Sequence, residues 1–358
     1  MYDVVVVGAG PGGSAAAKRC AERGLSTLLL EKKRLPREKC CSGLLLGRLA
    51  QRLVAQEFGP LPDDVVLTHM RGLQLWMPGI GERRIASDTP ITWRKDLDHW
   101  MVRAAQAAGA ELWEDSLVKL ILTDGGTSAI RVRKDGEERT VRARYVIGAD
   151  GAYSTVRKAL FPDNEFGTSP AYREWYPGGS GLEDDWAYVV FPRQVYRPNV
   201  WVCPKDDGFT LEGAGVRPLK DEIRGLLSAA GWTPSEPQWR DGCVSRALLF
   251  EHLATGEFVP ARGNTLLVGD AAGLQFPISG EGIGTALESG LLAADAIAAV
   301  AGGAAGRDAA AAAYLGALAP LQATLARMYA EVAGIRTLTG SALLEGLHEG
   351  FAHSFEVG

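Results

Sequence analysis

The N-terminal segment places a glycine-rich turn between two apolar runs. Residues 4–7 are consecutive valines, and a β-branched run of this kind is typical of a buried parallel strand. The turn that follows reads GAGPGG over residues 8–13 and fits the pattern GxGxxG. Residues 14–23 then predict a helix, and residues 25–30 predict a second strand that ends at Glu31. This order of elements constrains the chain to begin as a strand–helix–strand unit of a parallel sheet.

The same segment predicts a site for a dinucleotide. The glycines let the backbone approach a pyrophosphate, while the helix N-terminus offers amide donors and a partial positive charge. Glu31 is placed where a carboxylate accepts hydrogen bonds from the adenosine ribose, and it disfavours a 2′-phosphate. A glycine turn in an unrelated α/β protein is the alternative, which the joint context disfavours. The expected contacts are Gly8, Gly10, Pro11, Gly12, Gly13, Glu31 and Lys32.

Composition excludes several classes of function. The net charge of −5 argues against a nucleic-acid partner, which requires a basic face. The five cysteines show no CxxC spacing, and the five histidines show no spacing of metal ligands. An odd number of cysteines without a pairing pattern favours a reduced setting, so we expect a cytoplasmic protein without a metal site.

Apolar stretches do not predict a membrane span. Asp3 and the glycine turn interrupt the N-terminal apolar run, so a signal peptide is not expected. The apolar stretch 286–318 carries four charged residues and several glycines. Peripheral association with a membrane remains open.

Three further motifs are more specific than the glycine turn. Residues 150–157 read DGAYSTVR and match DGxxSxVR, and residues 266–273 read LLVGDAAG before a long predicted helix. Residues 277–284 read PISGEGIG, a glycine-rich turn that enters this helix. Together they resemble the flavoprotein family that joins aromatic hydroxylases of the para-hydroxybenzoate type, flavin-dependent halogenases and geranylgeranyl reductases. The resemblance covers residues 1–160 and 255–300.

This resemblance implies that the dinucleotide is FAD. It implies that Asp270 binds the ribityl chain, that the Asp150–Gly151 turn with Arg157 behind it braces the pyrophosphate region, and that Arg94 is a second pyrophosphate or ribityl contact. The turn before the long helix would aim amides at the N1/C2=O edge of the flavin, where the reduced ring carries negative charge. The further cofactor residues implied are Arg37, Cys41, Ser42, Gly43, Arg94, Val118, Asp150, Gly151, Arg157, Gly269, Asp270, Pro277, Gly280, Glu281, Gly282 and Ile283.

Within the family, the pattern favours the reductases. Gly284 stands where aromatic hydroxylases usually carry Asn, and the halogenase motif WxWxIP is absent. Residues 186–192 (WAYVVFP) and 36–43 (PREKCCSG) are similar to segments of geranylgeranyl reductases. The reductase hypothesis predicts hydride transfer from N5 of reduced FAD to a C=C bond of a lipophilic, isoprenoid-like substrate.

Two alternatives remain open. A monooxygenase would hydroxylate a small aromatic or natural-product substrate through a flavin C4a-hydroperoxide. A flavin-binding redox partner or sensor would show no turnover. Cys40 and Cys41 are the candidate catalytic residues, as a proton donor or packed against the ring, with inert buried cysteines as the other interpretation. Since the sequence has no second GxGxxG, the electron donor is NAD(P)H that docks transiently or a reduced carrier protein.

The expected fold is α/β, with a Rossmann-like FAD-binding domain, an inserted antiparallel-sheet substrate domain and C-terminal helices. Alternation over residues 70–85 predicts a hairpin, and aromatic and β-branched residues over 170–216 predict an antiparallel sheet. The predicted division assigns 1–69, 87–165 and 255–302 to the FAD-binding domain, 70–86 and 166–254 to the substrate domain, and 303–358 to a helical cap.

Overall fold

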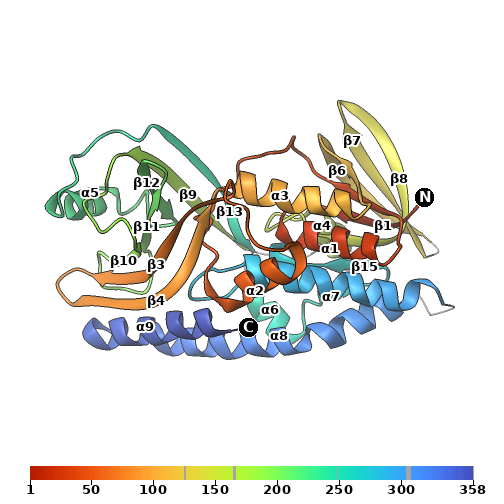
Figure 1. The fold of residues 1–358 in the computed structure, drawn as a ribbon. Helices are drawn as coiled ribbons and strands as arrows, with labels where there is room; N and C mark the ends of the chain where they lie inside the picture. The colour runs from red at the N-terminus through yellow and green to blue at the C-terminus, as the bar shows by residue number, and fades with distance from the viewer. Residues whose placement is uncertain (125, 164–166, 248, 304–307, 358) are drawn as a thin grey trace.

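The computed structural model describes residues 1–124, 126–163, 167–247, 249–303 and 308–357. Two β-sheets lie next to each other along the molecule, and the C-terminal helices run beneath both of them (Figure 1). The predicted fold class is confirmed: a Rossmann-like unit is joined to a second sheet and followed by helices.

The first sheet contains the N-terminal strand–helix–strand unit. Among the described residues it has eight strands, in the order β14-β15-β8-β1-β2-β5, with β6 and β7 attached to β8 as a meander. β1 is parallel to both β2 and β8, and its valines at 4–6 are fully buried. The strands are β1 (Tyr2–Val7), β2 (Thr27–Leu30), β5 (Glu111–Trp113), β6 (Ser116–Asp124), β7 (Thr127–Lys134), β8 (Glu137–Gly148), β14 (Ala261–Arg262) and β15 (Thr265–Leu267).

The second sheet is mixed, although an antiparallel sheet was expected. Its order is β13-β9-β12-β11-β10-β3-β4, and β10 is parallel to β3. After the β3–β4 hairpin the chain returns to the first sheet and re-enters the second sheet at β9; β10, which follows β9, runs in the same direction as β3. The strands are β3 (Val66–Met77), β4 (Gly81–Thr92), β9 (Thr168–Pro177), β10 (Ala187–Val190), β11 (Val200–Lys205), β12 (Gly208–Gly213) and β13 (Trp239–Ala247). The predicted boundary at 165/166 lies outside the described residues.

Helices cover the sheets in two groups. α1 packs between α3 and α7 beside the first sheet, while α5 covers one face of the second sheet and α9 covers part of the other. The helices are α1 (Pro11–Glu22), α2 (Gly47–Phe58), α3 (Arg94–Ala107), α4 (Thr155–Leu160), α5 (Lys220–Ala229), α6 (Phe250–Thr255), α7 (Ile283–Ala301), α8 (Ala309–Ile335) and α9 (Gly340–Glu356), with a 3₁₀ turn η1 (Gly269–Ala272).

The sequence of residues 41–55 favours a helix whose start is delayed by Gly43, and the helix begins at Gly47. Residues 41–46 instead form a loop in which Leu44 bridges to Ile91. Gly43 has a φ of +71°, and a Cβ added to it would lie 1.9 Å from the carbonyl oxygen of Thr92. The positive φ excludes a right-handed helical turn at Gly43, and the close approach leaves room only for glycine.

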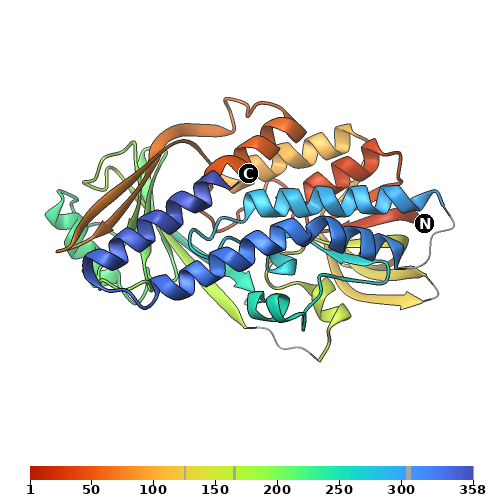
Figure 2. The ribbon, with the colours of Figure 1, turned by 90° about the horizontal axis from the view of Figure 1, so that it is seen from below.

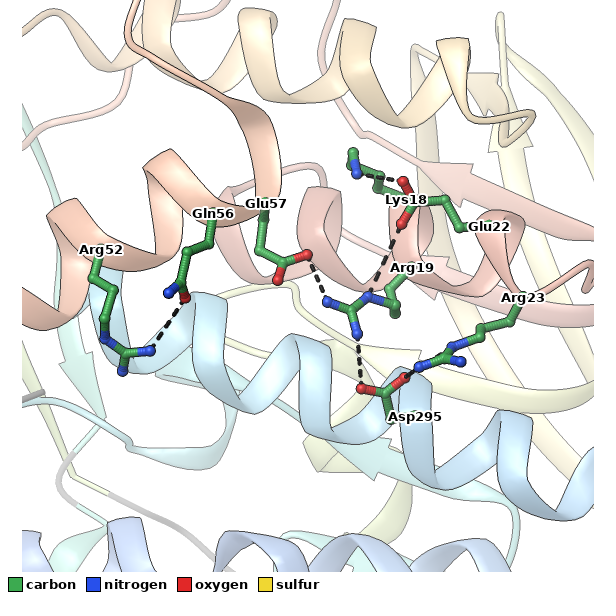
Figure 3. A network of polar contacts seen from close by, with 8 residues as sticks. All are labelled: Lys18, Arg19, Glu22, Arg23, Arg52, Gln56, Glu57 and Asp295. Atoms are coloured by element: carbon green, nitrogen blue, oxygen red, sulfur yellow. Dashed lines mark hydrogen bonds and ion pairs between the residues drawn. The ribbon is translucent and has the colours of Figure 1, made fainter.

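Ion pairs hold α1 against its neighbours (Figure 3). The Arg19 guanidinium on α1 contacts Glu57 of α2 at 2.6 Å and Asp295 of α7 at 3.0 Å. Arg23, one turn further along α1, contacts the same Asp295 at 2.9 Å. The helix that follows the glycine turn is therefore fixed by two other helices.

α7 and α8 are long and apolar enough to cross a membrane by length and composition alone. In α7, 61% of the apolar window is buried, because this helix packs against α1 and α8. In α8 the share is 33%. Figure 2 shows α8 extending along the first sheet toward the second, where it meets α9.

Candidate functional site

The glycine turn leaves one open position. Gly8 has a φ of +103°, and an added Cβ would lie 2.4 Å from the carbonyl oxygen of Ala149, so the ends of β1 and β8 touch here. A Cβ on Gly13 would lie 1.8 Å from the carbonyl oxygen of Gly8. Around Gly10, by contrast, the nearest heavy atom to an added Cβ is Nη2 of Arg94, at 3.9 Å. The space beside Gly10 is therefore available to a ligand.

The N-terminus of α1 points its unused donors at this space. Gly10 is the N-cap, no side chain caps the helix, and its first turn carries no acidic residue. The hydroxyl of Ser14, buried one turn into α1, has no hydrogen-bond partner among the described residues. An uncapped helix N-terminus is a favourable site for an anion such as a pyrophosphate.

Two arginines and two carboxylates border the turn. Oε2 of Glu31 lies 3.2 Å from the backbone nitrogen of Ala9 and 3.1 Å from Nε of Arg37. Arg37 also donates to the carbonyl oxygen of Ala9. Asp98, which is fully buried, accepts from Arg37 at 2.9 Å and from Arg94 at 2.8 and 3.0 Å. Asp98 was not among the predicted site residues, although its spacing of four from Arg94 on a predicted helix was a signal for this pair.

The DGxxSxVR motif shapes the backbone behind the turn. Oδ2 of Asp150 accepts hydrogen bonds from the backbone nitrogens of Thr155 and Val156, which cap α4. Arg157, 3% exposed, donates to the carbonyl oxygens of Ala152 at 2.6 Å and of Ala271 at 2.8 Å. Arg157 thus ties this motif to the GDAA motif, while the Asp150 carboxylate accepts hydrogen bonds from the first turn of α4.

The GDAA motif lies against the entrance of α7. Oδ1 of Asp270 accepts from Nε2 of Gln275 at 2.6 Å, and a Cβ added to Gly282 would lie 3.4 Å from the same oxygen. The backbone nitrogen of Gly269 donates to Oγ of Ser289 on α7. The GDAA motif and the start of α7, which are separate in the sequence, therefore lie against each other.

Glu281 caps α7 with its own carboxylate. Oε1 accepts from the backbone nitrogen of Gly284 at 2.6 Å, while Oε2 is buried without a hydrogen-bond partner among the described residues. Burial raises the pKa of Glu281 from 4.5 to about 7, although the hydrogen bonds from Gly284 and Ile283 oppose the shift. Glu281 was expected to contact the cofactor, and the structure adds that its carboxylate occupies a backbone amide at the start of α7.

Cysteines gather where the loop at 39–43 meets the second sheet. The carbonyl oxygen of Cys41 accepts from Nη1 of Arg173 at 3.0 Å. The Cys243 thiol on β13 lies 3.6 Å from the carbonyl oxygen of Cys40 and 3.6 Å from Nζ of Lys39. A hydrogen bond with the Cys40 thiol and the Lys39 ammonium lower the pKa of Cys243 to about 6, against the effect of burial. Cys243 and Arg173 were missed because the strands that carry them are far from residue 41 in sequence.

The remaining expected residues lie at the margin of the site. Val118 is buried on β6, and the first residue of that strand, Ser116, donates from its nitrogen to the carbonyl oxygen of Glu31. Ser42 is half-buried in the loop, and Lys32 is exposed. Their contacts with a cofactor stay predictions.

Comparison with known proteins identifies the ligand class. Residues 1–174 match the FAD binding domain family. The chain is 29% identical over 310 residues to digeranylgeranylglycerophospholipid reductase 2 of Methanopyrus kandleri, covering 82% of this chain and 76% of that one. A geranylgeranyl bacteriochlorophyll reductase-like protein of Thermoplasma acidophilum has a similar structure, with a TM-score of 0.71 at 20% identity, over 99% and 96% of the two chains. Aklavinone-11 hydroxylase, in a complex with FAD and aklavinone, has a TM-score of 0.63 at 20% identity, over 86% and 64%.

Residues 1–174 thus carry an FAD binding domain, and the chain as a whole is similar to FAD-dependent oxidoreductases. The geometry fits this cofactor, because the space beside Gly10 and the uncapped N-terminus of α1 suit a pyrophosphate. The reductase-like protein of Thermoplasma acidophilum and aklavinone-11 hydroxylase share this fold.

Proposed function

We propose that this FAD-dependent oxidoreductase is a reductase that transfers hydride to a C=C bond of a lipophilic, isoprenoid-like substrate. The observation that carries the proposal is the packing of Gly284. A Cβ added there would lie 2.9 Å from the backbone nitrogen of Ala50 and 3.0 Å from Cγ of Leu49. The Asn that aromatic hydroxylases usually carry at this position therefore has no room between α7 and α2.

The relative from Methanopyrus kandleri supports the same reaction class, since its name is that of a lipid reductase. Bound FAD would supply hydride at N5. In this proposal Gly10 and the start of α1 hold the pyrophosphate, Arg94 lies beside it, Asp270 binds the ribityl chain, and the entrance of α7 faces the pyrimidine edge of the ring.

The proton that completes the reduction needs a donor near the site. Glu281 is suited to this role, because its pKa of about 7 lets it hold a proton at neutral pH. Cys40 is less suited, because its hydrogen bond to Cys243 and its burial raise the pKa of its thiol. Cys41 remains a candidate.

Other parts of the proposal concern the surroundings of the enzyme. We propose a cytoplasmic protein that receives electrons from NAD(P)H or from a reduced carrier protein, and that has no nucleic-acid partner. Peripheral contact with a membrane fits a lipophilic substrate and the apolar composition of α8.

A monooxygenase is the second candidate function. It is favoured by the structural similarity to aklavinone-11 hydroxylase. It is also favoured by buried polar side chains, such as Glu212 and Lys205, on the inner face of the second sheet, which is the face opposite α5. A redox partner or sensor without turnover is the third.

Product analysis tests the proposal. The FAD-loaded protein is reduced without oxygen, supplied with a polyprenyl lipid, and the products are analysed by mass spectrometry. The reductase proposal predicts a gain of one pair of hydrogen atoms for each reduced double bond. Unchanged lipid, together with insertion of an oxygen atom into aromatic compounds when air is admitted, contradicts the reductase proposal and favours the monooxygenase.

A further inference from the structure

The inner face of the second sheet is polar where it meets the FAD-binding half. Residues that pair directly on neighbouring strands have side chains on the same face of the sheet. Cys203 pairs with Thr210, and Arg173 pairs with Glu212 on one side and with Asp241 on the other. Lys205 lies on this same face, two positions after Cys203 on β11. The opposite face packs against α5 and is apolar.

Most charges on this face have partners. Arg173 makes a two-point contact with Asp241, at 3.0 and 2.7 Å. Glu212 accepts a hydrogen bond from Oγ1 of Thr210 at 3.1 Å. Lys205 differs, because it is 1% exposed and its Nζ has no hydrogen-bond partner among the described residues. A buried ammonium without an acceptor is costly, so a site of this kind is suited to a ligand that brings one.

The Lys205 amine points out of the sheet toward the loop at 39–43. A Cβ added to Gly43 would lie 3.3 Å from Nζ, and the ring of Trp93 lies 3.8 Å from it. The ring centroid of Trp239 lies 5.9 Å from that of Trp93, and the Trp239 ring stacks on the Trp175 ring with their centroids 6.4 Å apart. The face of the Trp93 ring stabilises the Lys205 ammonium, but it does not accept hydrogen bonds from the N–H donors of that ammonium. Aromatic walls beside one free donor fit a flat, unsaturated ligand with one oxygen acceptor.

We propose that Lys205 binds a carbonyl or carboxylate oxygen of the substrate, and that the reducible C=C bond is conjugated to that group. This rests on the proposed reductase function. In the reaction, the C=C π bond breaks and hydride from reduced FAD forms a C–H bond at the carbon β to the carbonyl. The electron pair moves toward the oxygen, where the Lys205 ammonium stabilises the negative charge, and a proton then forms the second C–H bond at the α carbon. The substrate gains two hydrogens, and FAD is oxidised.

Binding measurements test the site without requiring turnover. The oxidised, FAD-loaded protein is titrated by calorimetry with geranic acid and with geraniol, which share one hydrocarbon chain and differ at the head group, so that the nearest double bond is conjugated only in the acid. We expect the wild type to bind the acid about ten- to a hundredfold more tightly than the alcohol, because a charged hydrogen bond forms only with the acid. Lys205→Met is expected to bind both compounds alike, and Lys119→Met, which removes an exposed lysine, to behave as the wild type.

The pH dependence distinguishes binding from a structural role. Burial and the nearby Arg173 lower the pKa of Lys205 to about 8, while Glu212, Cys41 and Cys203 act to raise it. The affinity of the wild type for geranic acid is therefore expected to fall as pH rises through this pKa, and that of Lys205→Met to stay level. The thermal midpoint of the variant without ligand is expected to be equal or higher, because an unpaired buried charge is removed.

The outcomes separate the Lys205 site from the reductase function. Preference for the acid that depends on Lys205, without reduction of any alkene, contradicts the reductase proposal and leaves the oxygen site standing. Equal affinity of wild type and Lys205→Met for the acid contradicts the oxygen site, as does binding of neither compound by the wild type. A lower thermal midpoint with unchanged preference for the acid would show that Lys205 is structural.

Discussion

The backbone nitrogen of Gly284 donates a 2.6 Å hydrogen bond to the carboxylate of Glu281. An anionic side chain therefore lies at the positive end of α7, where the superfamily resemblance places the pyrimidine edge of the flavin. Because burial raises the pKa of Glu281 to about 7, this carboxylate changes its charge near neutral pH. The charge at the helix entrance is thus set by pH as well as by the backbone.

Glu281→Gln is expected to remove a pH dependence of stability. The folded pKa exceeds the unfolded value, so the folded state binds more protons and stability falls as pH rises from about 4.5 through about 7. The shift corresponds to about 3 kcal/mol in the free energy of unfolding. Denaturant unfolding at about pH 5 and about pH 8 measures the change. An equal change in the free energy of unfolding between the two pH values for the variant and the wild type would contradict this prediction.

Gly10→Ala is expected to lose affinity for FAD, whereas Gly8→Ala is expected to lose stability. The first adds a methyl group in open space, so the fold persists and the affinity for FAD falls by about tenfold or more. The second forces a Cβ to within 2.4 Å of a carbonyl oxygen at a φ of +103°, so the protein is destabilised even without FAD. Thermal unfolding without FAD and a titration with FAD separate the two, with Gly316→Ala on α8 as the matched control. Normal FAD affinity in Gly10→Ala would overturn the assigned site.

Asp98→Ala is expected to destabilise the protein more without FAD than with it. The substitution leaves the guanidinium groups of Arg37 and Arg94 without their shared carboxylate, at a cost of about 3 kcal/mol. The negative charge of a pyrophosphate beside Arg94 is expected to replace part of the lost carboxylate charge when FAD is bound. Thermal midpoints with and without FAD measure the difference, and an equal loss in both states would place the pyrophosphate elsewhere.

Cys243 is expected to be the first cysteine alkylated at neutral pH. Its pKa of about 6 makes it largely a thiolate, whereas burial raises the pKa of Cys20 to about 12. Brief treatment with iodoacetamide followed by peptide mass spectrometry ranks the five thiols. Cys40→Ser is expected to keep a hydrogen bond to Cys243 and much of its reactivity, whereas Cys40→Ala slows it. Equal labelling of all five cysteines would contradict the lowered pKa of Cys243 and its hydrogen bond with Cys40.

Local patterns in the sequence were enough to predict the N-terminal strand–helix–strand unit and a dinucleotide, and the family resemblance implied FAD. The valine run, the glycine turn and Glu31 form a unit within a short stretch, so periodicity and turn chemistry specify it. The β3–β4 hairpin was predicted for the same reason. Gly43 was expected to delay the start of α2, but the starting residue, Gly47, could not be predicted, because it depends on the tertiary contact between Gly43 and Thr92.

The polar face of the second sheet could not be predicted in this way. Lys205 and Arg173 meet the loop at 39–43 only through the register of strands that are far apart in the sequence. The parallel pairing of β3 with β10 also depends on a long return of the chain through the first sheet. Glu281 was expected to contact the cofactor, but its capping of α7 depends on one side-chain rotamer.

A single-turnover experiment tests the reductase proposal most directly. The FAD-loaded protein is reduced without oxygen and mixed in a stopped-flow instrument with either oxygen or an unsaturated polyprenyl substrate, while flavin absorbance is followed. The proposal predicts slow reoxidation by oxygen without a transient species, and faster reoxidation by the substrate with a hydrogenated product. A long-lived absorbing species formed with oxygen, and no reoxidation by the substrate, would contradict it.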